Sequence, residues 1–397
     1  MEATSISRRL HGYSTGIRWL RTPTPNLCSR CQQRRLASTD VAQPATDSLS
    51  TEEVARARRY CLDLLRKSDT PSSLLLAYIP AHARDAYIAL RAFNIEVART
   101  ADTTSTPTIG SMRLQFQRDA IAKALSGQPP KQPIAILLAS AAASLHARTA
   151  GRSKWSKTWF TRIIDTREKH LTNPPYPNLD ALETYAENTY STLLYLTLQA
   201  LPMSSLTADH LASHIGKASG ITAVLRGLPL LAFPSAPTTH NTQGQMPGDI
   251  SARRQGSVML PLDIMASANV REEDVLRNGS RAHGLRDAVF AVATRANDHL
   301  ITARQMLADI RAGREEGHEF EHRDEEEHSY PTPGGKAAGQ QQEDVENAFG
   351  VLMPAVATQI WLERLEKEDF DVFSPKLRVT DWRLPWKAFW AWRRRKI

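Results

Sequence analysis

Cysteine, long apolar runs and strand signals are all scarce in this sequence. The 397 residues include three Cys, too few for the disulfide framework of a secreted scaffold. No stretch approaches the roughly 18–20 consecutive apolar residues that a membrane-spanning helix needs. Alternating β-branched runs bounded by turns are rare, which disfavours a β-rich fold. A chain of this length without these features is predicted to bury a large, helical core.

Acidic residues are almost missing from the two ends of the chain. Residues 1–39 contain seven Arg, no Lys and one Glu, a net charge of +6. Residues 382–397 contain four Arg, two Lys and no acid, again +6, so with +8 for the whole chain the part between them carries −4. Basic residues that bind nucleic acid form a patch or stripe on a domain. Charge confined to the ends instead predicts a targeting segment and an anchor, and no nucleic-acid partner.

The first end, residues 1–39, has the composition of a mitochondrial presequence. It is rich in Arg, Ser and Thr and nearly free of acids. Its apolar residues recur at helical spacing, at Ile6, Leu10, Tyr13, Ile17 and Leu20. The unbroken apolar stretch of a secretory signal is missing. We therefore expect import into mitochondria and removal of the segment near Arg34–Ser38.

The three cysteines suggest no chemistry. Cys28 and Cys31 form a CxxC inside the presequence, without the second ligand pair that a zinc site needs. We interpret that spacing as chance. Cys61 lies on an apolar helix face and is expected to be an inert core thiol.

Helical periodicity dominates residues 50–312, which we predict to form one all-α domain. Ser50 and Glu53 form a capping box that starts a helix, and the Pro71 region ends it. Further helices are predicted at about 80–102, 110–126, 132–148, 156–171, 179–201, 205–232, 262–268, 271–278 and 281–312.

Two segments interrupt this pattern. Residues 235–255 are rich in Pro, Thr, Gly and Gln and are predicted to form an exposed loop. Residues 313–346 contain eleven acids against three basic residues and are predicted to be a disordered insert, because few apolar residues are available to offset the entropy of ordering. His318, His322 and His328 within it suggest a metal site, but nothing there would hold ligands in a fixed geometry. Residues 347–397 are predicted to form C-terminal helices.

Several motifs resemble the squalene/phytoene synthase family. The segment Ile215–Arg226 resembles the family pattern L-G-x-A-x-Q-x-T-N-I-L-R, and Val258–Asp263 resembles its Y-L-P-x-D motif. Tyr185–Thr189 resembles the middle helix, and the resemblance spans about residues 52–312. It implies a single isoprenoid-synthase-like helical bundle around a central apolar cavity. In the family, aspartates on two facing helices hold Mg²⁺ ions, which bind and neutralise the diphosphate of a prenyl substrate.

The sequence departs from this pattern at the metal ligands. The positions of the family motif D-D-x-x-D fall on Ala98, Arg99 and Asp102, so only the last acid is kept. The second pair of acids falls on Gly227 and Leu231. We therefore predict no metal cofactor, and the loss argues against condensation of prenyl diphosphates.

Five charged residues are the candidates for lining the cavity: Arg91, Glu96, Asp102, Lys217 and Arg226. Arg226 would either bind an anionic head group or pair with Glu96 or Asp102 across the bundle, because a buried Arg needs a partner. An apolar lipid or prenyl chain is the ligand expected in such a cavity.

Within the family, the chain resembles the branch that takes part in assembling mitochondrial respiratory complex I. The phrases Phe93–Glu96, His214–Ala218 and Asp369–Phe373 contribute most to this resemblance. It implies a non-catalytic assembly factor, peripheral on the matrix side of the inner membrane, with complex I subunits or other assembly factors as partners. The alternative is an enzyme of altered chemistry that uses Glu96 and Asp102 on an isoprenoid or other lipid.

The last sixteen residues combine aromatic and basic side chains. Trp382, Trp386, Phe389 and Trp390 lie at helical spacing, and Arg393, Arg394 and Arg395 follow. Such a segment is typical of a helix that lies in an anionic membrane interface, here one rich in a cardiolipin-like lipid. The alternative is a helix whose Trp side chains pack back on the bundle.

Overall fold

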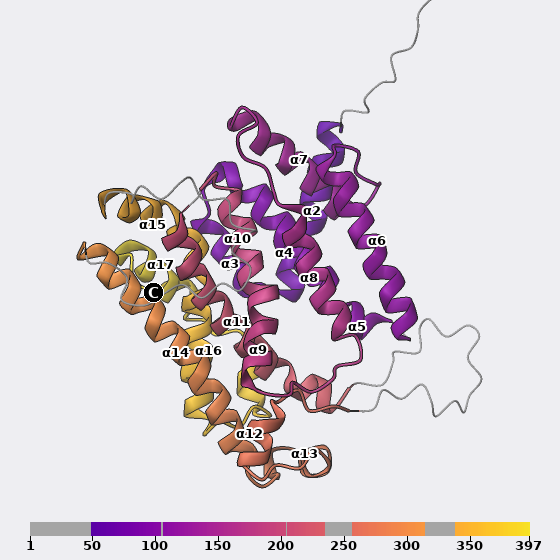
Figure 1. Ribbon diagram of the computed structural model, residues 1–397, viewed down its shortest axis with the longest axis vertical. Coiled ribbons are helices and arrows are strands. Elements are labelled where there is room, and N and C mark those ends of the chain that lie inside the picture. Colours follow the sequence, from indigo (N-terminus) through magenta and orange to yellow (C-terminus); the bar gives the residue numbers. More distant parts are fainter. Residues whose placement is uncertain (1–48, 105, 204, 235–255, 314–337) are drawn as a thin grey trace, which may run out of the picture. The chain divides into compact units, whose positions relative to one another are not determined.

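The computed structural model describes residues 49–397 apart from 105, 204, 235–255 and 314–337, and the described residues form one unit (Figure 1). Every regular element among them is helical, which confirms the all-α prediction. The predicted presequence, the CxxC pair, the 235–255 loop and the three His of the acidic segment lie outside the described residues.

The helices occur along the chain in the following order. The first group is α2 (Thr51–Ser68), α3 (Thr70–Leu75), η1 (Leu76–Tyr78), η2 (Ala81–Ala83), α4 (Arg84–Ala98), α5 (Thr100–Thr103), α6 (Pro107–Leu125), α7 (Pro133–Arg148) and α8 (Lys157–Lys169). The middle group is α9 (Leu179–Ala186), η3 (Glu187–Ser191), α10 (Thr192–Gln199), α11 (Leu206–Ala232), α12 (Leu262–Ser267), α13 (Glu272–Asn278) and η6 (Gly279–Arg281). The last group is α14 (Leu285–Arg311), α15 (Ala338–Leu352), α16 (Pro354–Lys367), η8 (Pro375–Arg378) and α17 (Leu384–Arg394).

Local chemistry explains where several of these helices begin. The predicted capping box is present at α2: the backbone N–H of Glu53 donates to Ser50 Oγ at 3.2 Å, and that of Ser50 donates to the Glu53 carboxylate at 3.1 Å. Helices α6, α7 and α16 each have Pro in their first turn, where its missing N–H costs no hydrogen bond.

The boundary of the acidic segment differs from the prediction. We predicted disorder through Glu346, but helix α15 begins at Ala338. Val345 and Phe349 are buried in it, and Glu346 pairs with Arg311 of α14 at 2.8 Å. The average composition of the predicted segment hid Val345, and Phe349 lies just beyond its predicted end. Helices α15 and α16 pack on α11 and α14, so residues beyond 347 belong to the same core as residues 50–312.

Helix α11 lies at the centre of the packing. It contacts α9, η3, α10, α14, α15 and α16, and it is buried on most of its surface. A helix that is apolar nearly all round has to be enclosed by other elements. The elements that directly precede α11 in the chain, α9 to α10, and the helices α14 to α16 that follow it therefore all pack on α11.

The helix predicted at 179–201 is interrupted by a π-helical turn, η3, between α9 and α10. Such turns insert an extra residue into a helix and change the direction of its side chains. Helix α11 packs directly on η3. A Cβ atom on Gly216 would overlap the backbone of Ser191, and one on Gly220 would lie 2.9 Å from Cα of Ala186. These two glycines allow the close approach.

We expect Gly216→Ala to lower the free energy of unfolding by about 1–3 kcal/mol or more, because the added methyl group forces α11 away from η3. Gly227→Ala is the matched control on the same helix, since a Cβ there meets no atom within 4 Å. It should stabilise the protein by about 0.5–1 kcal/mol through helix propensity. Urea denaturation measures both variants, and equal effects would contradict this account of the packing.

Candidate functional site

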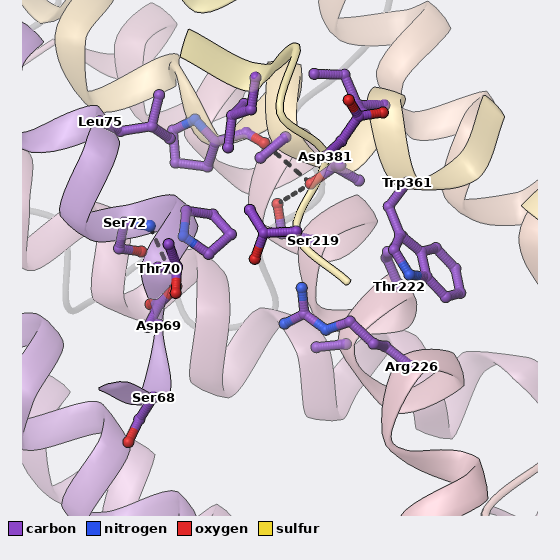
Figure 2. Close-up of a pocket in the computed structure, with 18 of the residues that line it drawn as sticks. Ser68, Asp69, Thr70, Ser72, Leu75, Ser219, Thr222, Arg226, Trp361 and Asp381 are labelled. Carbon is purple, nitrogen blue, oxygen red and sulfur yellow. Dashed lines mark hydrogen bonds between the residues drawn. The ribbon is translucent and has the colours of Figure 1, made fainter. Parts of the chain in front are cut away.

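A cavity of about 430 Å³ lies between α4, α11, α16 and the segment that leads into α17 (Figure 2). Helix α4 lines it from Arg91 to Ala98, followed by its C-cap residue Arg99, and α11 lines it from Ser219 to Arg226. These are the two helices on which the family resemblance predicted the facing walls of a site. The cavity is therefore the candidate functional site.

The lining of the cavity is strongly basic. The resemblance implied an apolar cavity, and apolar side chains such as Leu75 and Ile95 do contribute to its wall. Two acids, Asp69 and Asp381, are also present. The basic residues of the lining are Lys67, Arg91, Arg99, Arg226, Arg364 and Arg378.

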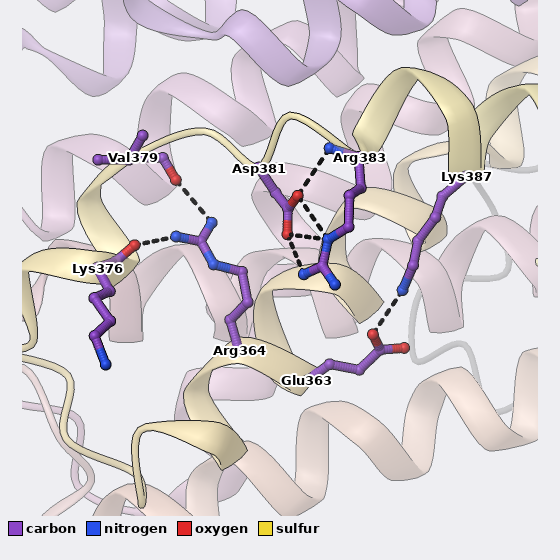
Figure 3. Close-up of polar contacts among 7 residues, drawn as sticks. All are labelled: Glu363, Arg364, Lys376, Val379, Asp381, Arg383 and Lys387. Carbon is purple, nitrogen blue, oxygen red and sulfur yellow. Dashed lines mark hydrogen bonds and ion pairs between the residues drawn. The ribbon is translucent and has the colours of Figure 1, made fainter.

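Both acids of the lining are held by other groups. Asp69 caps α3 and accepts the backbone N–H of Ser72 at 3.2 Å. Asp381 accepts two hydrogen bonds from the guanidinium of Arg383, from Nε at 3.0 Å and Nη2 at 2.7 Å (Figure 3). Hydrogen bonds from Arg383 lower the pKa of Asp381 to about 2. Asp381 is thus paired with a cation beside it, whereas Asp69 keeps its charge as a helix cap, and the six basic residues of the lining outnumber these two acids.

The wall formed by residues 375–384 is fixed to α16 by polar contacts (Figure 3). Arg364 of α16 donates to the carbonyl oxygen of Val379 at 2.7 Å and to that of Lys376. Lys387 of α17 pairs with Glu363 of α16 at 2.7 Å. These contacts hold η8 and the residues that follow it as a defined wall of the cavity.

Arg91 is the most buried charged residue of the lining. It is 6% exposed, and its Nε and Nη2 atoms have no hydrogen-bond partner among the described residues. The guanidinium carbon lies 5.3 Å from the centroid of the Tyr87 ring. Burial raises the pKa of Tyr87, so this neighbour is neutral. The contact with Tyr87 supplies no negative charge to the buried guanidinium, and two of its nitrogen atoms are left without an acceptor among the described residues, which is energetically costly.

Arg226 lines the cavity but is exposed, and its guanidinium group points into the cavity (Figure 2). We had expected a buried Arg226 that either pairs with Glu96 or Asp102 or binds an anion. The premise of burial is wrong, because this part of α11 faces an open cavity. Neither Glu96 nor Asp102 lines the cavity.

The other predicted residues lie elsewhere. Glu96 is half-buried and close enough to Cys61 of α2 for its charge to act on the thiol. Burial, with a smaller contribution from Glu96, raises the pKa of Cys61 to about 12, as expected for an inert core thiol. Asp102 is exposed on α5, and Lys217 is half-buried on α11 outside the cavity lining. The structure thus brings together Arg91 and Arg226 but not the other three.

Several lining residues were not among the five charged candidates. Arg99 was noted only as the position of a missing acid, although it lies two helical turns from Arg91 and therefore on the same face. Thr222 lies in the motif that carries the family resemblance. Trp361 and Arg364 come from α16, and no motif connects that helix with the cavity.

The fold and the site together point to one family. The sequence profile of squalene/phytoene synthase matches residues 65–387. The chain belongs to the squalene/phytoene synthase family. In two solved structures, a dehydrosqualene synthase and the squalene synthase HpnC of Alicyclobacillus acidocaldarius, the same fold recurs. The first has a TM-score of 0.57 at 14% identity and covers 85% of this chain and 96% of its own. The second has a TM-score of 0.55 at 12% identity, and the match covers 82% of this chain and 98% of the HpnC chain. The predicted isoprenoid-synthase-like fold is confirmed.

Within the family, the chain is similar to curated proteins named NADH dehydrogenase (ubiquinone) complex I, assembly factor 6. The Bos taurus protein is 36% identical over 390 residues, which cover 96% of this chain and 98% of the relative. The Homo sapiens protein is 33% identical over 373 residues, covering 92% and 93%. These matches confirm the predicted resemblance to that branch of the squalene/phytoene synthase family.

The family resemblance implies magnesium ions held by carboxylates, and the residues of this cavity do not fit them. Ala98 has no ligand atom, and Arg99 is a cation; both line the cavity. Gly227 and Leu231, at the second family motif, have no ligand atoms either. In the part of the chain that the structure describes, no three His, Cys, Asp or Glu side chains gather as a metal site. Hard cations need oxygen ligands, which arginines cannot supply.

The aromatic side chains in and before α17 divide into two sets, because Trp392 packs against Tyr78 and Phe349 whereas the others are exposed. Trp386 and Trp390 are 65% and 48% exposed, and Trp382 and Phe389 are exposed as well. Trp382, Trp386 and Trp390 border a groove of about 580 Å³ together with residues of α14 and α16. None of the helices in the described ranges combines the length and the apolar character that crossing a membrane requires.

The basic end of the chain divides into two parts. Arg393 and Arg394 are exposed, as a membrane-surface segment would require. Arg395, which we had placed in that surface, instead pairs with Glu346 at 3.1 Å, and its guanidinium carbon lies 3.8 Å from the centroid of the Trp392 ring. A left-handed backbone at Arg395 ends the helix and turns this side chain back to the core.

A second polar cluster, the Glu183 cluster, joins α11 to α9 and α14. It consists of Glu183 of α9, His214 of α11, and Arg295 and His299 of α14. Glu183 pairs with Arg295 and lies 3.4 Å from His299 Nε2, while the Nδ1 atoms of His299 and His214 are 3.0 Å apart. Burial alone would raise the pKa of Glu183, but the contacts with His299 and Arg295 outweigh it and lower that pKa to about 2.

We expect Glu183→Gln to lower the free energy of unfolding at pH 7 by roughly 3 kcal/mol, because the native pKa lies well below the ordinary value. For an acid whose pKa is lowered by folding, the stabilisation is complete above the ordinary pKa of 4.5 and disappears as the pH falls towards about 2. Urea denaturation of both proteins should therefore give a difference that shrinks below pH 4.5. A difference that stays constant with pH would rule out this role for the carboxylate.

Proposed function

We propose that this chain is a non-catalytic assembly factor for mitochondrial respiratory complex I, acting on the matrix side of the inner membrane. Its full-length similarity to the proteins named assembly factor 6 supports the assembly role. The acid-poor, Arg-rich residues 1–39 support import into mitochondria. Complex I subunits or other assembly factors are the expected partners.

The single observation that carries the non-catalytic part is Arg99 in the cavity wall at a metal-ligand position of the family. Ionisation of a prenyl diphosphate needs metal ions that neutralise the leaving group. Here a basic residue replaces an acid, and Ala98 beside it supplies no ligand atom. The ancestral chemistry therefore lacks its metal ligands on this wall.

The alternative, an enzyme that uses Glu96 and Asp102 on a lipid, finds no support in the geometry. A catalytic pair has to reach the same reacting group. Neither side chain lines the cavity, and the Glu96 charge acts on Cys61 of α2 instead.

The two functions predict different results for the double variant Glu96→Gln/Asp102→Asn. In cells that lack the chain, we expect this variant to restore complex I activity as well as the wild type does, because neither acid has a catalytic task. Complex I activity and the abundance of the variant are measured together, with an empty vector as the negative control. An abundant variant that restores no activity would favour the enzyme, as would turnover of farnesyl or geranylgeranyl diphosphate with Mg²⁺ by the purified protein.

We further propose that α17 holds the protein on the membrane surface. Exposed Trp side chains next to Arg393 and Arg394 match the aromatic and basic faces of interfacial helices. Each basic residue near an anionic surface contributes about 1 kcal/mol. An anionic, cardiolipin-like lipid is the partner that fits this charge, with its acyl chains against the aromatic rings.

The double variant Trp386→Ser/Trp390→Ser should bind cardiolipin-containing vesicles at least about tenfold more weakly than the wild type, since two large apolar side chains no longer enter the interface. Met112→Ser/Phe116→Ser is the matched control, because these two exposed residues are also four apart on a helix. Vesicle flotation at physiological salt measures both. Similar loss in the two variants, or none in either, would assign the α17 aromatics another role.

A further inference from the structure

Unpaired polar atoms gather around the cavity. Three of its lining residues have buried polar atoms with no hydrogen-bond partner among the described residues: Arg91 at Nε and Nη2, Thr222 at Oγ1 and Trp361 at Nε1. Buried polar groups in folded proteins nearly always have partners, so such a group calls for an explanation. Three of them on one cavity suggest that the missing partner belongs to a ligand.

The chemistry of these groups defines that ligand. Guanidinium and indole N–H groups are donors only, and a hydroxyl group accommodates either role. The ligand therefore has to supply acceptors. Arg91, Arg99 and Arg226 add positive charge, while Asp69 and Asp381 are held by Ser72 and Arg383. An anion would satisfy both the positive charge of the arginines and the unpaired hydrogen-bond donors of the lining.

We propose that this cavity binds a phosphate or diphosphate group directly through Arg91 and Arg226, without a divalent metal ion. Guanidinium groups form charge-assisted, often bidentate hydrogen bonds to phosphate oxygens. Arg91 approaches from the α4 wall and Arg226 from the α11 wall, so the two would enclose the anion. The Nε and Nη2 atoms of Arg91, which have no acceptor among the described residues, would then bind the oxygens of the anion.

The dimensions and the rest of the lining leave room for more than the anion. A volume of about 430 Å³ exceeds that of one phosphate group, and Leu75, Ile95 and Ile360 add apolar surface. The ligand is thus a phosphorylated molecule with an apolar part, either a small soluble compound or a lipid whose head group enters the cavity. This inference does not depend on the assembly role.

The first test is calorimetric titration of the protein, residues 40–397, with inorganic diphosphate in the presence of EDTA. We expect binding in EDTA to be as tight as binding with Mg²⁺. Arg226→Gln should weaken it by about tenfold or more, because a charge-assisted hydrogen bond is lost. Arg277→Gln is the control, since Arg277 is an exposed arginine on α13 outside the cavity; its affinity should stay within about twofold of the wild type.

A second variant tests the buried charge itself. Without anion, Arg91→Met should unfold at the same or a higher urea concentration than the wild type, because it removes an uncompensated charge and keeps the volume of the side chain. Saturating diphosphate should raise the unfolding midpoint of the wild type and leave that of Arg91→Met unchanged. Lower stability of Arg91→Met in the absence of anion would mean that the protein already compensates Arg91, and would overturn the proposal.

The source of the anion is separated by a second probe, dihexanoyl phosphatidic acid below its micellar concentration. Tighter binding of this probe than of inorganic phosphate, weakened by Arg226→Gln, would assign the site to a lipid head group, and the reverse order to a soluble phosphate. Three results would overturn the proposal. They are no binding of diphosphate or of dihexanoyl phosphatidic acid, binding that requires Mg²⁺, and equal losses of affinity in Arg226→Gln and Arg277→Gln. Each leaves the complementation result for complex I unaffected, so the two proposals fail separately.

Discussion

The close contact between α11 and the π-helical turn η3 is the constraint on which the rest of the packing depends. Gly216 and Gly220 let the two backbones meet, and any side chain at Gly216 would overlap Ser191. From this position α11 presents Thr222 and Arg226 to the cavity and His214 to the Glu183 cluster on α9 and α14. The same contact therefore determines the core and the position of one cavity wall.

The cavity lies between α4 and α11, the helices that carry the metal-ligand positions of the family, but basic residues outnumber acidic ones in its lining. The family uses carboxylates to hold cations that in turn bind an anion. In this chain, basic side chains line the wall and the carboxylates that would hold metal ions are missing. We propose that an anion binds to the arginines directly. A shared fold with a changed site is a common way for one scaffold to acquire a different role. Residues 375–384 connect this cavity with α17, so the cavity and the proposed membrane face share one segment.

Sequence patterns predicted most of the helices, but they predicted only part of the cavity lining. The boundaries at Ser50 and Pro133 follow from local capping chemistry, which a sequence displays directly. The π-helical turn at Glu187 and the start of α15 at Ala338 depend on packing against α11 and were not predicted. At the site, Arg91 and Arg226 were predicted from the motif helices, whereas the exposure of Arg226 and the contribution of Trp361 depend on how α16 closes the cavity. That arrangement joins residues more than a hundred positions apart, and no local pattern records it.

The central claim is that a basic cavity has replaced a metal-carboxylate site. Native mass spectrometry of the chain isolated from mitochondria tests it most directly, with EDTA present throughout. The account predicts a retained phosphorus-containing ligand that carries no metal and is lost from the Arg226→Gln protein. A ligand that leaves when EDTA removes Mg²⁺, or a wild-type chain that retains none, would contradict it.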